Sequence, residues 1–220
     1  MSTQTTDPGF PVPDAHDAIE PLDVIGARDA RGLPTTRPEA ILCDRDGTLV
    51  VDVPYNDDPA LVQPLPGVAD ALAAARRAGM RTAIVTNQSG IARGLITPER
   101  LDAVHGRIDE LLGPFDAIVH CPHDDDDGCS CRKPMPGLVE RAADLLGVPT
   151  SACVVIGDTR ADVSAAYGAG AIGMLVPNER TLPLEVRGVA HVHGDFADAV
   201  ERVLGWRRGH GPAAFRGATA

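Results

Sequence analysis

Short apolar runs alternate along the chain with longer stretches in which apolar residues recur every three or four positions. The short runs are typical of buried strands, and the 3.6-residue period is that of amphipathic helices. Strands are therefore predicted at residues 40–43, 81–86, 115–120, 152–156 and 171–176, and helices at residues 68–78, 97–112, 136–146 and 159–167. A last short strand at residues 189–192 and a helix at residues 195–204 are expected to close the sheet.

This alternation predicts an α/β fold. Strands that alternate with helices pair in parallel, and the helices cover both faces of the sheet, which gives a three-layer Rossmann-like architecture. Local signals agree, because Gly79 suits a left-handed helix cap and Thr97 with Pro98 forms a helix start. Between Thr48 and Thr86 the pattern leaves room for one helix and one strand, so no separate cap domain is expected.

The two ends of the chain show neither the apolar runs of strands nor the 3.6-residue period of helices. Residues 1–38 are rich in Pro, Asp, Thr and Gly, and we expect a disordered extension there. Residues 206–220 have the same character and are expected to form a flexible tail. Residues 39–205 remain as one folded domain.

Charge and hydropathy narrow the class of protein. The 220 residues include 31 acidic and 20 basic side chains, a net charge of -11, which disfavours nucleic acid as a partner. No stretch approaches the roughly 20 apolar residues that cross a bilayer, and the N-terminus lacks the basic start and apolar run of a signal peptide. A cytoplasmic protein without a membrane partner is therefore expected. No apolar stripe is left unexplained that would indicate an interface with a second copy of the chain, so we expect a monomer.

Polar side chains stand where the predicted strands end. Asp44 and Asp46 follow the first strand, Thr86 ends the second, and Asp158 follows the fourth. The carboxyl ends of parallel strands meet at one edge of the sheet, where ligands bind. In a continuing extended chain Asp44 and Asp46 point to the same side, and they repel unless a cation such as Mg²⁺ lies between them. Lys133, the single lysine of the chain, is expected to join this edge.

Four segments in this order resemble the motifs of the haloacid dehalogenase superfamily of phosphohydrolases: DRDGTL at residues 44–49, IVTNQ at 84–88, Lys133, and GDTRAD at 157–162. The resemblance covers about residues 40–176. It implies that Asp44 is the nucleophile that forms an aspartyl-phosphate and that Asp46 is the general acid and base. Thr86 and Lys133 would hold the phosphoryl oxygens. Mg²⁺ is expected at Asp44, Asp46 and Asp158, whereas Asp162 is either a neighbour of the metal site or a charge that favours a helix N-terminus.

Three cysteines and a histidine gather within one short loop. Cys121, His123, Cys129 and Cys131 make a complete tetrahedral set for Zn²⁺, which leaves no position for substrate and so predicts a structural metal. The metal would fix the residues that follow Cys131. A reduced, metal-free loop is the alternative. The acidic run at residues 124–127 cannot turn every carboxylate toward one ion, so we interpret it as a solvated loop tip and not as a calcium site.

The segments CPH, CxCRKP and TNQSGIARG narrow the resemblance to the branch of heptose 1,7-bisphosphate 7-phosphatases and histidinol-phosphate phosphatases. This implies a small phosphorylated metabolite as the substrate. The implied substrate-binding residues are Asn87, Gln88, Ser89, Arg132, Lys133, Asp52 and Tyr55. Removal of the 7-phosphate of D-glycero-D-manno-heptose 1,7-bisphosphate is expected, with histidinol phosphate as the alternative substrate. A phospho-acceptor signalling domain and a zinc-stabilised binding protein without catalysis are the competing hypotheses from other classes.

Overall fold

A parallel five-stranded sheet forms the centre of the protein, with the strand order β3-β2-β1-β4-β5. The computed structural model describes residues 36–208. The strands are β1 (Ala40–Cys43), β2 (Arg81–Asn87), β3 (Ala117–Cys121), β4 (Cys153–Gly157) and β5 (Ile172–Leu175). Every residue of β1 is buried, because the strand lies between β2 and β4 and its side chains pack into a core on each face of the sheet.

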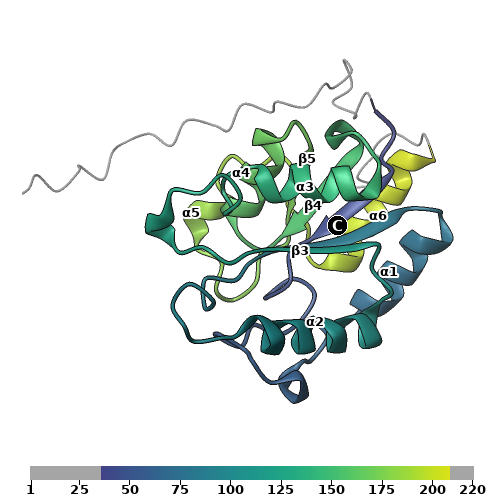
Figure 1. Cartoon of the computed structure of the whole chain (residues 1–220). Coiled ribbons are helices and arrows are strands. Elements are labelled where there is room, and N and C mark those ends of the chain that lie inside the picture. Colours follow the sequence, from purple (N-terminus) through teal and green to yellow (C-terminus); the bar gives the residue numbers. More distant parts are fainter. Residues whose placement is uncertain (1–35, 209–220) are drawn as a thin grey trace, which may run out of the picture.

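Helices cover both faces of the sheet, as Figure 1 shows. They are α1 (Val68–Arg77), α2 (Pro98–Leu112), α3 (Gly137–Leu146), α4 (Arg160–Gly168), α5 (Pro183–Val186) and α6 (Phe196–Arg207). Side chains alternate along β1, so Ile41 and Cys43 belong to the core that includes α1, α2 and α6, whereas Ala40 and Leu42 belong to the core that includes α3 and α4. Burying each large aliphatic side chain in these two cores contributes about 1.5–3 kcal/mol. The predicted three-layer α/β fold is confirmed.

Most predicted elements lie within two residues of the observed ones. Gly79 has a φ of +74°, as a left-handed cap requires, and the Thr97 side chain caps the first turn of α2. The predicted strand at residues 189–192 is wrong, because this segment makes only an isolated bridge between Leu175 and Val192. Its hydrogen bonds join Leu175 to His191 and His193, which extends the sheet by one residue pair and no further. The short helix α5 was not predicted.

The loop between β1 and α1 contains a single turn of 3-10 helix (Pro59–Leu61), so no separate cap domain interrupts the described chain at this point. The extension predicted at residues 1–38 and the tail predicted at 206–220 fall mostly outside the described residues. The predicted start of the tail is wrong, because α6 continues to Arg207 and Trp206 is buried in the core. Among residues 36–208, no helix combines the length and the apolar character needed to cross a membrane.

Candidate active site

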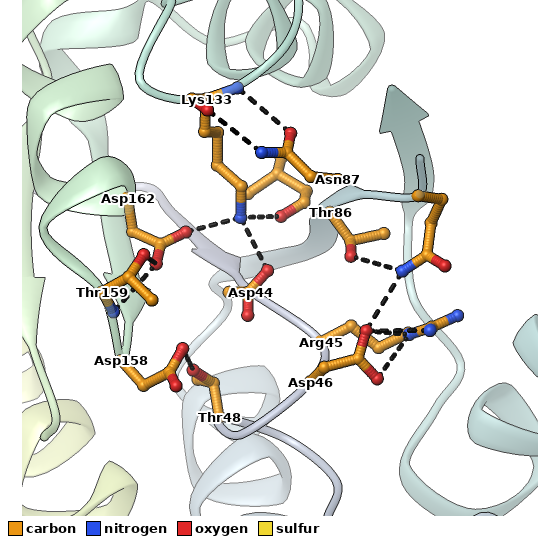
Figure 2. Close-up of polar contacts among 12 residues, drawn as sticks. Asp44, Arg45, Asp46, Thr48, Thr86, Asn87, Lys133, Asp158, Thr159 and Asp162 are labelled. Carbon is orange, nitrogen blue, oxygen red and sulfur yellow. Dashed lines mark hydrogen bonds and ion pairs between the residues drawn. The ribbon is translucent and has the colours of Figure 1, made fainter. Parts of the chain in front are cut away.

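Five polar residues from separate strand ends and loops meet at the carboxyl edge of the sheet (Figure 2). Asp44 follows β1, Asp158 follows β4, and Asp162 lies in the first turn of α4. Thr86 belongs to β2, and Lys133 comes from the loop before α3. The parallel register explains this convergence, since Cys43 of β1 lies beside Ile84 of β2 and Ile156 of β4.

The ammonium group of Lys133 is the centre of the cluster. Its Nζ donates to Asp44 Oδ1 at 2.6 Å, to Asp162 Oδ1 at 2.5 Å and to the carbonyl oxygen of Val85 at 2.8 Å. Asn87 fixes the backbone of the lysine, because its side chain accepts from the Lys133 amide at 3.1 Å and donates to the Lys133 carbonyl at 3.0 Å. All three ammonium protons therefore have acceptors, and the lysine is held at both ends of its side chain.

Three buried carboxylates face this single ammonium group. Oxygen atoms of Asp44, Asp158 and Asp162 all lie within 4.8 Å of one another, which is close enough to bind one metal ion. Burial raises the pKa of Asp158 to about 6, and the neighbouring Asp162 acts in the same direction. Burial also raises the pKa of Asp44, whereas the Lys133 ammonium opposes that rise. One lysine does not balance three carboxylates, so the cluster favours a further cation.

The position of Asp158 depends on residues from two other loops. Asn178 Nδ2 donates to Asp158 Oδ2 at 2.7 Å, and Thr181 Oγ1 donates to the Asp158 carbonyl at 2.8 Å. A Cβ atom on Gly47 would lie 2.5 Å from Asp158 Oδ2. Glycine is therefore required at position 47 both for this close approach and for its φ of +78°.

The structure does not place Asp46 beside Asp44 and Asp158 as predicted. The chain turns at Gly47 instead of continuing as a strand, with the Gly47 amide donating to the Val50 carbonyl at 2.9 Å. The Asp46 carboxylate accepts from Arg45 Nη2 at 2.8 Å and from Gln88 Nε2 at 3.1 Å, away from the other acids in Figure 2. The predicted continuation of the extended strand through Asp44 and Asp46 is therefore wrong.

Asp162, whose role the sequence left open, belongs to the cluster. Its Oδ2 accepts from the Thr159 hydroxyl at 2.6 Å and from the Thr159 amide at 3.1 Å, which caps α4. Its Oδ1 accepts from Lys133. One carboxylate thus stabilises the helix N-terminus and holds the lysine at the same time.

Arg45 and His105 also belong to the site but were not singled out from the sequence. Arg45 is buried, and its Nη1 lies 3.4 Å from His105 Nε2 of α2. Burial lowers the pKa of His105 to about 3, so the ring is neutral at physiological pH and accepts a hydrogen bond from Arg45. An arginine between two acids gives no sequence signal of burial, and its contact with His105 joins residues that are 60 positions apart in the chain.

The predicted zinc ligands form a second cluster. Ligand atoms of Cys121, His123, Cys129 and Cys131 all lie within 4.8 Å of one another. Five of the six pairs are 3.2–3.7 Å apart, from Cys131 Sγ–Cys121 Sγ to Cys121 Sγ–Cys129 Sγ. A tetrahedral zinc ion with Zn–S bonds of about 2.3 Å places its ligand atoms roughly 3.8 Å apart, so the four groups fit such an ion.

Three of the predicted substrate-binding residues have a polar or oppositely charged partner. Asp52 pairs with Arg180, Arg132 pairs with Asp125, and the Tyr55 hydroxyl accepts from Arg93 Nη1 at 2.6 Å. Two further predicted residues lie on the loop after β2: Ser89 is half-buried, and Gln88 donates to both Asp46 and Thr86. Arg93 and Arg180 were not predicted as site residues.

Comparisons with known proteins point to one family. Residues 55–170 match the family model of the haloacid dehalogenase-like hydrolases. The chain is 36% identical over 176 residues to the D-glycero-beta-D-manno-heptose-1,7-bisphosphate 7-phosphatase of Pseudomonas putida, covering 74% of this chain and 98% of that protein. It is 39% identical over 176 residues to the enzyme of the same name from Mesorhizobium japonicum, covering 74% of this chain and 81% of that protein.

Solved structures agree with the sequence relatives. The D,D-heptose 1,7-bisphosphate phosphatase of B. bronchiseptica, solved with magnesium and phosphate, has a TM-score of 0.68 and 34% identity, covering 76% of this chain and 98% of that one. A putative phosphatase of the same superfamily from Mesorhizobium loti has a TM-score of 0.66 and 31% identity, covering 88% of this chain and 99% of that one. The resemblance predicted from the four motifs is confirmed.

Proposed function

This chain belongs to the haloacid dehalogenase-like hydrolases, and from that premise we propose that it removes the 7-phosphate of D-glycero-D-manno-heptose 1,7-bisphosphate through an aspartyl-phosphate on Asp44. The observation that carries the proposal is the placement of Lys133 Nζ 2.6 Å from Asp44 Oδ1 at the carboxyl edge of the sheet. A nucleophile beside a fixed ammonium group suits attack on a phosphoryl group, because the ammonium offsets the charge of the phosphoryl oxygens.

The reaction proceeds in two displacements. A carboxylate oxygen of Asp44 attacks phosphorus, the bond from phosphorus to the heptose oxygen breaks, and Asp46 gives a proton to that oxygen. Water then loses a proton to Asp46 and attacks the aspartyl-phosphate, which frees inorganic phosphate and restores the Asp44 carboxylate. For these steps Asp46 must leave the hydrogen bonds that it accepts from Arg45 and Gln88, and its side chain is 25% exposed. Thr86 and Lys133 hold the phosphoryl oxygens.

Mg²⁺ is the cation that fits the acidic cluster. It prefers carboxylate oxygens together with water, and the carboxylates of Asp44 and Asp158 would hold it. Bound there, it supplies positive charge to a developing phosphoryl transition state. The Asp46 carboxylate, which lies with Arg45, is left out of this ligand set. Asp162 remains the partner of Lys133.

Zn²⁺ at the cysteine cluster has a structural role in this proposal. Four protein ligands complete its tetrahedral shell, so it takes no part in the chemistry. Cys131 precedes Arg132 and Lys133, and the Arg132 amide lies 3.4 Å from Cys129 Sγ. Zinc therefore orders the backbone from which Lys133 reaches Asp44. The substrate body lies against Asp52, Tyr55, Arg132 and the loop of Asn87, Gln88 and Ser89.

The decisive measurement is kcat/KM for release of phosphate from heptose 1,7-bisphosphate and from histidinol phosphate, both with Mg²⁺. The proposal requires a clear preference for the heptose compound. An equal or reversed ratio would reject that substrate while keeping the phosphatase chemistry. Absence of phosphate release from either compound and from an aryl phosphate would reject the mechanism itself.

A further inference from the structure

The acidic run Asp124–Asp127, here called the acidic tip, makes specific contacts with two arginines. Arg132 Nε and Nη2 both lie 2.7 Å from Asp125 Oδ1. Arg93, from the loop after β2, donates to both carboxylate oxygens of Asp124, at 2.6 and 2.8 Å. Arg93 Nη2 is also 3.6 Å from Asp125 Oδ2, so the Asp125 carboxylate lies between two guanidinium groups. The tip is therefore not merely a solvated loop end.

The Asp125 carboxylate contacts the Arg132 guanidinium as an anionic ligand would. A guanidinium fork binds carboxylates and phosphates through the same pair of parallel N–H groups. Arg132 is the residue next to Lys133, which contacts the proposed nucleophile. A cavity of about 310 Å³ is lined by Asp125, Arg132 and Lys133. A substrate with a second phosphate would thus meet an arginine that already holds an anion.

The two partners differ in their freedom to move. The Asp125 side chain is 67% exposed and the Arg132 side chain is 21% exposed. Arg132 is further anchored by its amide on Cys129 Sγ and by a 3.4 Å contact from Nη1 to the His123 carbonyl. The carboxylate can therefore rotate into water while the guanidinium stays in place.

We propose that Asp125 is an internal counter-anion of Arg132, which the non-reacting phosphate of the substrate displaces on binding. This inference rests on the proposed function, because it needs a substrate with a second phosphate. Because the Arg132–Asp125 ion pair must break, displacement of Asp125 weakens the binding of every ligand that contacts Arg132. It also speeds release of the product, which keeps that phosphate. A ligand without a second phosphate leaves the Arg132–Asp125 pair intact and is unaffected.

The test measures binding separately from turnover. In an Asp44→Asn background, which lacks the nucleophile and slows turnover, calorimetry gives the Kd of heptose 1,7-bisphosphate and of heptose 7-phosphate. Adding Asp125→Asn should lower the Kd of the bisphosphate about two- to fivefold, the range of a partly exposed ion pair. The Kd of the 7-phosphate should stay the same. With Arg132→Met also present, Asp125→Asn should have no effect on either Kd.

Asp126→Asn is the matched control, since it removes one charge from the same acidic tip and Asp126 has no ion pair within residues 36–208. An equal effect of Asp126→Asn would mean that the net charge of the tip acts and not the pair with Arg132, and the inference would fall. An unchanged or weaker bisphosphate affinity in Asp125→Asn would also overturn it, as would no measurable binding of the bisphosphate. Failure of the proposed function is read separately, from the kcat/KM ratio of the unmodified enzyme.

Discussion

At the scale of single residues, the largest loss of activity is expected from substitution of Asp44. Replacing Asp44 by Asn removes the nucleophile, so kcat should fall by roughly 10³-fold or more. The fold should persist, because Lys133 keeps Asp162 and the Val85 carbonyl as acceptors. Phosphate release measures the first effect and thermal unfolding the second. Asp46→Asn, which removes the acid and base together with the charge that pairs with Arg45, should lower kcat by about 10²–10⁴-fold. A folded Asp44→Asn enzyme with most of its activity would refute the nucleophile assignment.

Gly47 tests the link between a turn and the metal site. Gly47→Ala places a Cβ atom 2.5 Å from Asp158 Oδ2 at a φ of +78°. Gly170→Ala is the matched control, because Gly170 has a φ of +73° with nothing within 4 Å of a Cβ. Both variants should lose about 1 kcal/mol or more of stability from the backbone strain. Only Gly47→Ala should also need more Mg²⁺ for half-maximal activity. Equal Mg²⁺ requirements would show that the contact with Asp158 is unimportant.

At the scale of secondary-structure elements, the pattern of apolar residues predicted the strands whose positions depend on burial alone. β1 and β4 are buried on both faces, so their sequences are continuous apolar runs, and their ends fix where Asp44 and Asp158 lie. The apolar pattern did not predict the path of the chain where hydrogen bonds determine it. The turn at Gly47 redirects Asp46 toward Arg45, and a strand periodicity gives no warning of such a turn.

The zinc loop connects one element to the catalytic edge. Removing zinc, or replacing Cys131 by Ser, should lower kcat about 10–100-fold, because the backbone that carries Lys133 loosens. Zinc content by atomic absorption and kcat should fall together, and added zinc should restore the chelated wild-type enzyme. Cys153→Ser, in the buried strand β4, is the control that should retain zinc. Full turnover in the zinc-free protein would disprove this coupling.

At the scale of the whole molecule, the acidic cluster should make stability depend on pH and on Mg²⁺ together. The folded-state pKa values of Asp44 and Asp158 are raised, to about 8 and about 6, chiefly by burial. The unfolded value is about 3.9, so between about pH 4 and 8 the folded state binds more protons than the unfolded state. The contribution of these two groups to stability is therefore present at low pH and is lost as pH rises through their folded pKa values.

Mg²⁺ should reverse this loss, because it replaces the protons that the carboxylates release. At 100 times its Kd, a ligand that binds only the folded state adds about 2.7 kcal/mol, which is roughly 5–10 °C in Tm for a chain of this size. The gain in Tm from Mg²⁺ should therefore be near that value at pH 8 and much smaller at pH 5, where protons compete. Asp158→Asn should remove most of the gain at pH 8, whereas Asp126→Asn, in the exposed acidic tip, should keep it. A gain that does not change with pH, or that survives in Asp158→Asn, would place the ion elsewhere on this acidic protein.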